Sequence, residues 1–383
     1  MEKTKLVAKR VFRYASLLSI ISLFIIPPLW SFAGETIKIG VILATTGVYA
    51  SMGEGEKLAA VLAIKNLNET GGVIGKKLEM IFEDDEGDPG KGSMAIRKLI
   101  SIDKVVSIFG SNSNIVSHTI SLIAEEMKVP MIAAVPSRKV VMGKQFVFHD
   151  VPTEDILFEL VGEYSQAKGW KKVGILHDAT EYGMDLSKGM SEWWVPKSVT
   201  PVLAKFSPGA SDVSPQWLVL RRENVEGVFL AAGPAKAAAI ALKNRKQLGI
   251  TIPVIVSPSL ANNKFLELAG DAAEGIMIVS HYHFGKWTPG QLNLINYMKK
   301  EAPDVSLENH HALGWDGIHL LAAAIKKAGS SEPANIRDAL ERLKNYDGAV
   351  GVYNFSPTNH NGHGRGSLTI SKVKDGKFAA LED

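Results

Sequence analysis

Apolar runs of strand length alternate with helical patterns along the first half of the chain. The run Ile37–Leu43 leads through a Thr/Gly-rich turn into a stretch that carries Leu58, Val61, Leu62 and Leu67. Short apolar runs bounded by turn residues are typical of buried strands, and spacings of three or four are typical of helices. The pattern continues with strands at 77–82, 105–109 and 130–134 and helices at 93–102 and 114–127. It predicts a parallel sheet covered by helices on both faces.

The same pattern begins again in the middle of the chain. Lys171–Leu176 repeats Ile37–Ile42 at an offset of 134 residues. Strands at 202–206, 227–230, 253–256 and 275–279 and a helix at 235–248 follow it. Each copy of the repeat is the first strand of its own series of strands and helices. A mature chain of about 350 residues is also longer than a domain with a single hydrophobic core usually is. We therefore predict two similar α/β lobes.

The C-terminal region departs from the alternation. Three successive helices are predicted at 292–300, 308–328 and 333–344, and the middle one places Trp315, Ile318, Ala322 and Ile325 on one face. Short β segments at 351–355, 368–373 and 377–379 then surround a loop rich in Pro, Asn, His and Gly. Such a tail can be shared between two lobes.

A secretory signal peptide is predicted for residues 1–33, so that the mature chain begins near Gly34. Five Lys and Arg residues precede the apolar run Ala15–Ile26, and Ser31 and Ala33 are the small residues of a cleavage site. The run is shorter than the roughly 20 residues that cross a membrane. An uncleaved N-terminal anchor is the alternative.

Removing the signal changes the charge of the protein. The whole chain carries +3 and residues 1–33 carry +4, so the remainder carries −1. A near-neutral protein without a Lys/Arg cluster argues against nucleic acid or an anionic membrane surface as a partner. The sequence has no cysteine, which excludes disulfides, thiol chemistry, cysteine-ligated metal and a lipid-modified cysteine. We therefore expect a protein that is free in a periplasm.

Motifs for catalysis and for cofactors are absent from the sequence. It contains no G-x-x-x-x-G-K-[ST] phosphate loop, and neither G-x-S-x-G nor G-x-G-x-x-G follows a predicted strand. Histidines cluster in pairs at 281/283, 310/311 and 360/363, and the spacings of the first two pairs suit zinc poorly. We interpret the last pair as polar loop residues, and we expect no catalytic residue, no metal and no cofactor.

Polar turns follow the predicted strands at their carboxyl ends, where open α/β sheets bind small ligands. Hydroxyl groups and free backbone N–H groups at helix starts can hold a carboxylate without a buried Lys or Arg. Each turn alone could be a helix cap or a tight turn, but six of them on two facing lobes predict a ligand cleft. The six turns are Thr45–Tyr49, Ser111–Asn114, Ala134–Ser137, Glu181–Gly183, Gly233–Pro234 and Ser257–Ser259.

Five segments occur in an informative order: Ile37–Gly53, Gly71–Lys77 running into Phe82–Asp85, Tyr182–Gly183, Ala269–Gly275 and Tyr353–Pro357. Together they resemble the leucine/isoleucine/valine-binding family of periplasmic solute-binding proteins, over essentially the whole mature chain. The resemblance implies an α/β type I periplasmic binding protein fold, with two doubly wound α/β lobes joined by three hinge crossovers. Lobe one would comprise residues 36–153 plus 284–347, and lobe two residues 154–283 plus 348–383.

The resemblance also implies a ligand site. The positions that bind the ligand's carboxylate in the family correspond here to Asn114, the backbone of Ala134–Pro136 and Ser137. The aromatic contact of lobe one falls on Met52, with Tyr49 nearby, and Tyr182 is the expected wall from lobe two. With adjoining turn residues, the predicted ligand-binding residues are Tyr49, Met52, Asn112, Ser113, Asn114, Ala134, Val135, Pro136, Ser137, Tyr182, Gly233, Pro234 and Ser259.

Ser259 departs from the pattern of the family's amino-acid binders, which place a glutamate there against the ligand's ammonium group. Burying an ammonium without a counter-charge costs on the order of several kcal/mol. Ser259 therefore favours a carboxylate without the amine, such as an aromatic or aliphatic acid. An amino acid paired with a substitute acid is the alternative, and Glu181, Asp155 and Asp178 are the nearest candidates in the sequence.

The predicted function is that of the extracytoplasmic substrate-binding component of an ABC importer. It would be a monomer that closes its lobes around the solute and is recognised by the permease subunits. A ligand sensor that signals to a partner protein would use the same cleft. A secreted hydrolase would need a nucleophile, a base and an orienting group, and none is recognisably spaced.

Overall fold

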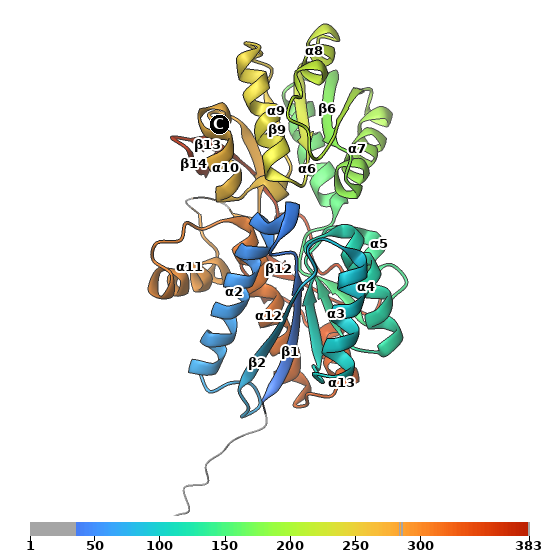
Figure 1. Ribbon diagram of the computed structural model, residues 1–383, viewed down its shortest axis with the longest axis vertical. Helices are drawn as coiled ribbons and strands as arrows, with labels where there is room; N and C mark the ends of the chain where they lie inside the picture. Colours follow the sequence, from blue (N-terminus) through green and yellow to red (C-terminus); the bar gives the residue numbers. More distant parts are fainter. Residues whose placement is uncertain (1–35, 283, 285, 382–383) are drawn as a thin grey trace, which may run out of the picture. The chain divides into compact units, whose positions relative to one another are not determined.

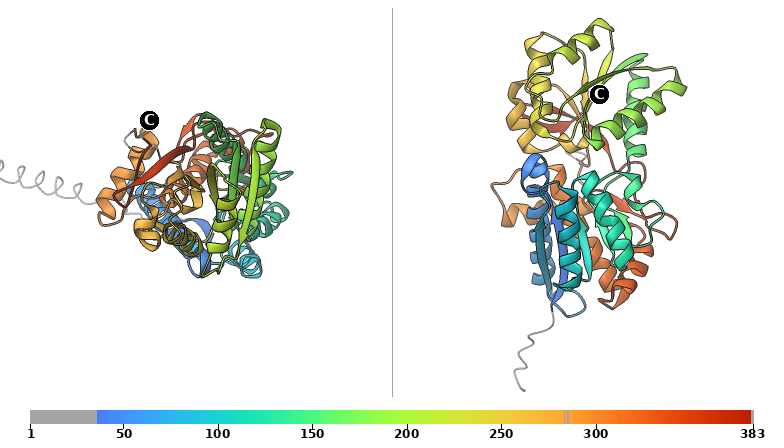
Figure 2. Two further views of the ribbon diagram at one scale, coloured as in Figure 1. Left: turned by 90° about the horizontal axis from the view of Figure 1, so that it is seen from above. Right: turned by 45° about the vertical axis from the view of Figure 1, so that its right-hand side comes forward.

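The computed structural model of the 383-residue chain describes residues 36–381 except 283 and 285. The predicted signal peptide therefore lies outside the described residues. Figures 1 and 2 show the helices packed around the β-sheets of this part of the chain. None of its described helices combines the length and the apolar character that crossing a membrane requires.

The first sheet consists of five parallel strands in the order β2-β1-β3-β4-β5. Alternate side chains of β1 enter different cores, because Ile39 and Val41 pack with α2 and Ile42 packs with α3 and α4. The predicted parallel sheet with two covered faces is confirmed. The elements are β1 (Ile37–Leu43), η1 (Gly47–Tyr49), α2 (Ala50–Glu69), β2 (Leu78–Asp84), α3 (Pro89–Ser101), β3 (Ser107–Gly110), α4 (Asn114–Met127), β4 (Met131–Ala133), α5 (Arg138–Val141) and β5 (Val147–His149).

The second sheet has the order β14-β13-β10-β9-β8-β6-β7. Five of its strands are parallel, and β13 and β14 extend it in antiparallel fashion. Numbered along the chain, the parallel strands of both sheets follow the order 2-1-3-4-5, so the sequence repeat is also a repeat of topology. The elements are α6 (Glu154–Ala167), β6 (Lys172–Asp178), α7 (Glu181–Trp194), η2 (Val195–Lys197), β7 (Thr200–Phe206), α8 (Ser214–Arg222), β8 (Gly227–Ala231), α9 (Ala235–Gln247), β9 (Val254–Val256), η3 (Pro258–Leu260), α10 (Asn263–Ala269), η4 (Gly270–Ala273), β10 (Met277–Ser280), β13 (Thr369–Lys374) and β14 (Lys377–Ala380).

The glycine shared by the two repeats has the same packing role in each sheet. A Cβ atom at Gly40 would lie 2.7 Å from Cδ1 of Ile108, and one at Gly174 would lie 2.9 Å from Cδ2 of Leu220. Both distances are shorter than ordinary van der Waals contact. The missing side chain at each position therefore lets neighbouring apolar side chains pack directly on the first strand of the sheet.

The three predicted C-terminal helices are present as α11 (Pro289–Glu301), α12 (Asn309–Ala328) and α13 (Pro333–Glu341). Helix α12 packs more extensively against α2 than against any other helix. At the contact, a Cβ atom at Gly314 would lie 1.9 Å from the backbone oxygen of Glu56. The two helices approach this closely because position 314 carries no side chain.

The closing segment contributes to both cores. Tyr353 and Phe355, in and just after β12 (Val352–Tyr353), join the core of the first sheet, whereas Leu368 and Ile370 join that of the second. The predicted boundary at residue 348 assigned Tyr353 and Phe355 to lobe two, although both side chains pack in the core of the first sheet. The lobe boundaries stay a prediction, and we propose that the last crossover follows Phe355.

A buried carboxyl group holds the start of this segment. Asp316 of α12 accepts hydrogen bonds from the N–H groups of Ala349 and Val350 and from the hydroxyl of Tyr353, each at 2.8 Å. These bonds fix the short hairpin of β11 (Tyr346–Asp347) and β12, at its turn and at Tyr353, to the central helix.

Several element boundaries differ from the prediction for local reasons. Helix α3 begins at Pro89 rather than at residue 93, because the side chain of Asp88 caps the backbone N–H of Lys91 at 2.8 Å. Helices α5, α6, α8 and α10 and strands β5 and β11 were not predicted. Helix α6 had a usable signal, since Thr153 precedes the acidic residues Glu154 and Asp155 at its start.

The interpretation of His360 and His363 as polar loop residues is wrong, because both are buried. The His360 ring stacks on Phe148 with centroids 4.0 Å apart, and its Nδ1 donates to the carbonyl of Val147 at 2.9 Å. His363 Nε2 donates to the carbonyl of Asp150 at 3.0 Å. The loop folds back over the end of β5, so its histidines satisfy backbone carbonyls there.

Replacing Gly314 with alanine is expected to lower the free energy of unfolding by about 2–3 kcal/mol, because the new methyl group forces α2 and α12 apart. Urea denaturation followed by circular dichroism measures this change. Gly209→Ala is the matched control, since nothing lies within 4 Å of a Cβ atom there, and it should change stability by less than about 1 kcal/mol. Equal stability of the two variants would contradict the close helix contact.

Candidate functional site

A cavity of about 180 Å³ opens among the turns that follow the carboxyl ends of the strands. Its walls come from the turns after β1, β3, β4 and β5, from those after β6, β8, β9 and β10, and from the start of α12. This is the position at which open α/β sheets hold ligands. Ten of the thirteen predicted site residues line the cavity: Tyr49, Met52, Asn112, Asn114, Ala134, Val135, Pro136, Tyr182, Gly233 and Ser259.

Three predicted residues lie behind the wall. Ser113, Ser137 and Pro234 are buried and do not line the cavity. Ser137 precedes α5, where its carbonyl accepts from the N–H of Val140 at 3.0 Å. These three positions were assigned from their place in a turn, and the direction of a side chain within a turn is set by its neighbours.

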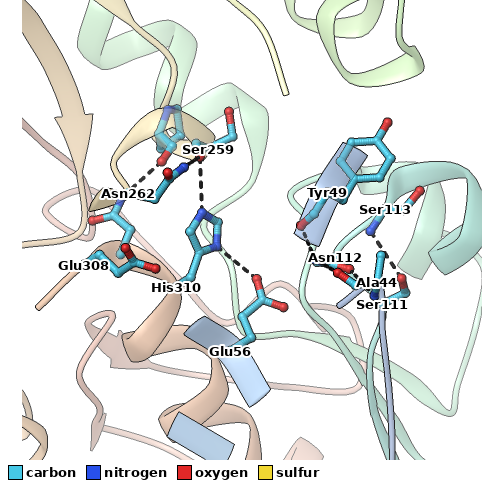
Figure 3. A network of polar contacts seen from close by, with 12 residues as sticks. Ala44, Tyr49, Glu56, Ser111, Asn112, Ser113, Ser259, Asn262, Glu308 and His310 are labelled. Atoms are coloured by element: carbon cyan, nitrogen blue, oxygen red, sulfur yellow. Dashed lines mark hydrogen bonds and ion pairs between the residues drawn. The ribbon is translucent and has the colours of Figure 1, made fainter. Parts of the chain in front are cut away.

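Asn112 connects the turns after β1 and β3. Its Oδ1 accepts from the backbone N–H of Ala44 at 2.9 Å, and its Nδ2 lies 3.5 Å from the carbonyl oxygens of Ala44 and Tyr49 (Figure 3). Both ends of the amide are thus engaged by the protein. Asn112 lines the cavity chiefly as a residue that positions Tyr49.

Asn114 is the first residue of α4 and has an unused donor. Its Nδ2 atom is buried and has no hydrogen-bond partner, and the residue lines the cavity. The first backbone N–H groups of a helix lack intrahelical acceptors and carry partial positive charge. The start of α4 therefore presents donors without a formal charge.

Tyr49 and Tyr182 add two phenol groups to the wall. Burial raises the pKa of each to about 12, and the nearby carboxyls of Asp178 and Glu181 contribute at Tyr49. Both therefore stay protonated near neutral pH. Gly233 lies beside them, where a Cβ atom would be 3.4 Å from Tyr49.

The polar groups of Gly233 and Ser259 in the cavity wall form hydrogen bonds within the protein. Gly233 donates its N–H to Oδ2 of Asp178 at 2.8 Å. The hydroxyl of Ser259 donates to the carbonyl of Ala232 at 2.8 Å. Neither residue keeps its most obvious donor free for a ligand.

The three acids considered as substitute counter-charges occupy different environments. Asp178 accepts from the backbone N–H groups of Thr180 and Gly233. Asp155 is exposed and lies 3.6 Å from Arg138. Glu181 lines the cavity, but its carboxylate is 3.8 Å from Nζ of Lys139.

Sequence reasoning missed a buried pair in the wall, Glu56 and His310. Oε1 of Glu56 lies 3.0 Å from Nδ1 of His310, and Nε2 of His310 lies 3.2 Å from the carbonyl oxygen of Ser259 (Figure 3). Burial, with the nearby carboxyls of Asp85 and Glu308, raises the pKa of Glu56 well above its ordinary value. Burial lowers the pKa of His310.

A sequence signal for Glu56 did exist. It follows Met52 by four residues on α2, on a face whose next members are buried alanines. A glutamate inside a buried helical stripe is rare unless it is paired. His281 and Asn309 also line the cavity and were not predicted as site residues.

The histidines do not form a metal site within the described part of the chain. No group of three or more His, Cys, Asp or Glu side chains is placed there to hold a metal ion. His283 lies outside the described residues. Burial lowers the pKa of His281 to about 3, so its ring is neutral.

Comparisons with known proteins agree with this architecture. A Leu/Ile/Val-binding protein homologue of Brucella melitensis is 26% identical over 92% of this chain and 95% of its own length. A leucine-, isoleucine-, valine-, threonine- and alanine-binding protein of Pseudomonas aeruginosa is 24% identical over 85% of this chain and 87% of its own length.

A crystal structure of a leucine-binding protein from Thermotoga maritima has the same fold. It superimposes with a TM-score of 0.83 at 24% identity, over 91% of this chain and 98% of its own. The predicted two-lobed α/β fold is thereby confirmed. The sequence profile described as "Periplasmic binding protein" matches residues 36–377, nearly the whole described chain, and the protein therefore belongs to the periplasmic binding protein family.

Proposed function

We propose that the chain captures a small solute by its carboxylate and delivers it to the permease of an ABC importer. The observation that carries this proposal is the buried, unpartnered Nδ2 of Asn114, a residue that lines the cavity at the start of α4. The residues described as lining the cavity include no Lys and no Arg. Neutral donors would therefore hold the anion, as helix N-termini do elsewhere.

The family and the relatives support binding rather than catalysis. The relative from Pseudomonas aeruginosa is named as an amino-acid-binding protein, and that from Brucella melitensis as a homologue of one. We infer that this chain likewise binds its solute without making or breaking bonds. A cavity of about 180 Å³ is smaller than the roughly 300–1,000 Å³ of drug-sized pockets, which favours a small metabolite.

The two lobes would close around the solute, because the residues of the cavity wall belong to both sheets. Asn114 and Tyr49 follow strands of the first sheet, whereas Tyr182 and Ser259 follow strands of the second. A solute that contacts both groups at once stabilises the arrangement in which they are close together. This closed form is what the permease subunits would recognise.

The location and the assembly state are part of the proposal. A predicted signal peptide precedes a chain whose described helices include no membrane span. Membership of the periplasmic binding protein family supports a protein that works in the periplasm. We propose that it does so as a monomer.

Asn114→Ala is expected to weaken the binding of carboxylate ligands by about 10- to 100-fold, because one hydrogen bond to a charged group is lost. The ligands are first identified by a thermal-shift screen of amino acids and of aromatic and short-chain carboxylates, and affinity is then measured by calorimetry. Ser137→Ala is the control, since Ser137 lies behind the wall, and it should bind within about twofold of wild type. Unchanged affinity in Asn114→Ala would remove the start of α4 from the site.

Ligand addition is expected to reduce the radius of gyration in small-angle X-ray scattering, because the solute draws the two groups of wall residues together. The comparison uses the same protein with and without a ligand from the screen. The closure mechanism would be rejected if a saturating ligand left the scattering curve unchanged.

A further inference from the structure

The pair formed by Glu56 and His310 places an unsatisfied acceptor in the cavity wall. Both side chains are buried, with relative exposures of 0% and 4%. Oε2 of Glu56 is buried without a hydrogen-bond partner, and both residues line the cavity. In Figure 3 this oxygen points away from the imidazole of His310.

The hydrogen bonds of His310 fix where the protons lie. The carbonyl oxygen of Ser259 can only accept, so Nε2 of His310 carries a hydrogen and donates to it at 3.2 Å. At the other side of the ring, Nδ1 and Oε1 of Glu56 are 3.0 Å apart, so one proton lies between them. That proton belongs either to a carboxylic acid or to an imidazolium. In both forms Oε2 of Glu56 carries no proton and is an acceptor.

The surroundings of Glu56 favour a cation as its partner. The carboxyls of Asp85, after β2, and of Glu308, before α12, both act on Glu56, as does that of Asp150 after β5. A cationic donor at Oε2 would draw the shared proton onto His310 and leave a carboxylate facing the ligand. The proton stays within the pair, because removing it would set two lone pairs against each other across 3.0 Å.

We propose that Oε2 of Glu56, supported by His310, is the acceptor for an amino group on the solute. This inference rests on the proposed carboxylate site at Asn114 and adds a second contact to it. It supplies the counter-charge that Ser259 lacks, from α2 rather than from the turn after β9. The ligand class is then a small zwitterion with one carboxylate and one ammonium group.

The test uses three pairs of carboxylates that differ by one amino group. They are L-leucine and 4-methylpentanoate, L-phenylalanine and 3-phenylpropanoate, and 4-aminobutanoate and butanoate. Calorimetry with the wild-type protein should show tighter binding of the amino member in the pair that binds best. Tighter binding of the deaminated member would overturn the role of Glu56 and leave the carboxylate site standing. Failure of all six compounds to bind would overturn both proposals.

Glu56→Gln separates the charge from the hydrogen bond. A glutamine amide can donate to Nδ1 of His310 and keep its oxygen toward the cavity, but it cannot become a carboxylate. The variant should bind the amino member about 5- to 50-fold more weakly and the deaminated member within about threefold of wild type. Glu54→Gln, on the exposed side of the same helix, is the matched control and should bind both as wild type does. Equal losses for both members in Glu56→Gln would overturn the proposal.

A measurement on the wild-type protein makes the test independent of how well the variant folds. Nitrogen-15 chemical shifts of His310 report which ring nitrogens are protonated. They should move toward the imidazolium values when the amino member binds, and they should stay unchanged with the deaminated member. An unchanged His310 signal on saturation with the amino member would count against the pair as its acceptor.

Discussion

The close packing of α2 against α12 is the contact on which the site depends. Gly314 allows the backbone of α2 to approach α12. The backbone oxygen of Glu56 lies only 1.9 Å from the place that a Cβ atom at position 314 would occupy. The same approach brings the side chain of Glu56 to His310, near the start of α12. Because backbone atoms are in contact, the geometry of the pair is set by the rigid helices rather than by mobile side chains.

Internal hydrogen bonds account for most of the polar wall. Asn112 and Ser259 hydrogen-bond to neighbouring backbone atoms, and the N–H of Gly233 in the wall donates to Asp178. Among the side chains described as lining the cavity, the buried atoms left without partners are Nδ2 of Asn114, Oε2 of Glu56 and Nδ1 of His281. A buried polar atom without a partner costs stability. These three atoms are thus where a ligand gains most by supplying a partner.

The two sheets form the scaffold, and the turns at their ends form the site. Their inner strands are buried on both faces, and the two sheets repeat one topology, with Gly40 and Gly174 at matching positions. The turns at their carboxyl ends supply most of the residues that line the cavity. A repeat of this kind keeps the positions of the turns constant while their residues are free to suit a particular solute.

The sequence by itself determined the alternation of strands and helices and the repeat that begins at residue 171, and ten of the thirteen site residues predicted from it line the cavity. Local patterns suffice for these, because burial in a parallel sheet demands apolar runs and the ligand position follows from strand direction. Only the tertiary structure decided that Ser137 is buried away from the cavity, that His360 is buried and that Glu56 contacts His310. Glu56 and His310 are 254 residues apart in the chain, and their contact depends on how two helices pack, which no local pattern of residues specifies.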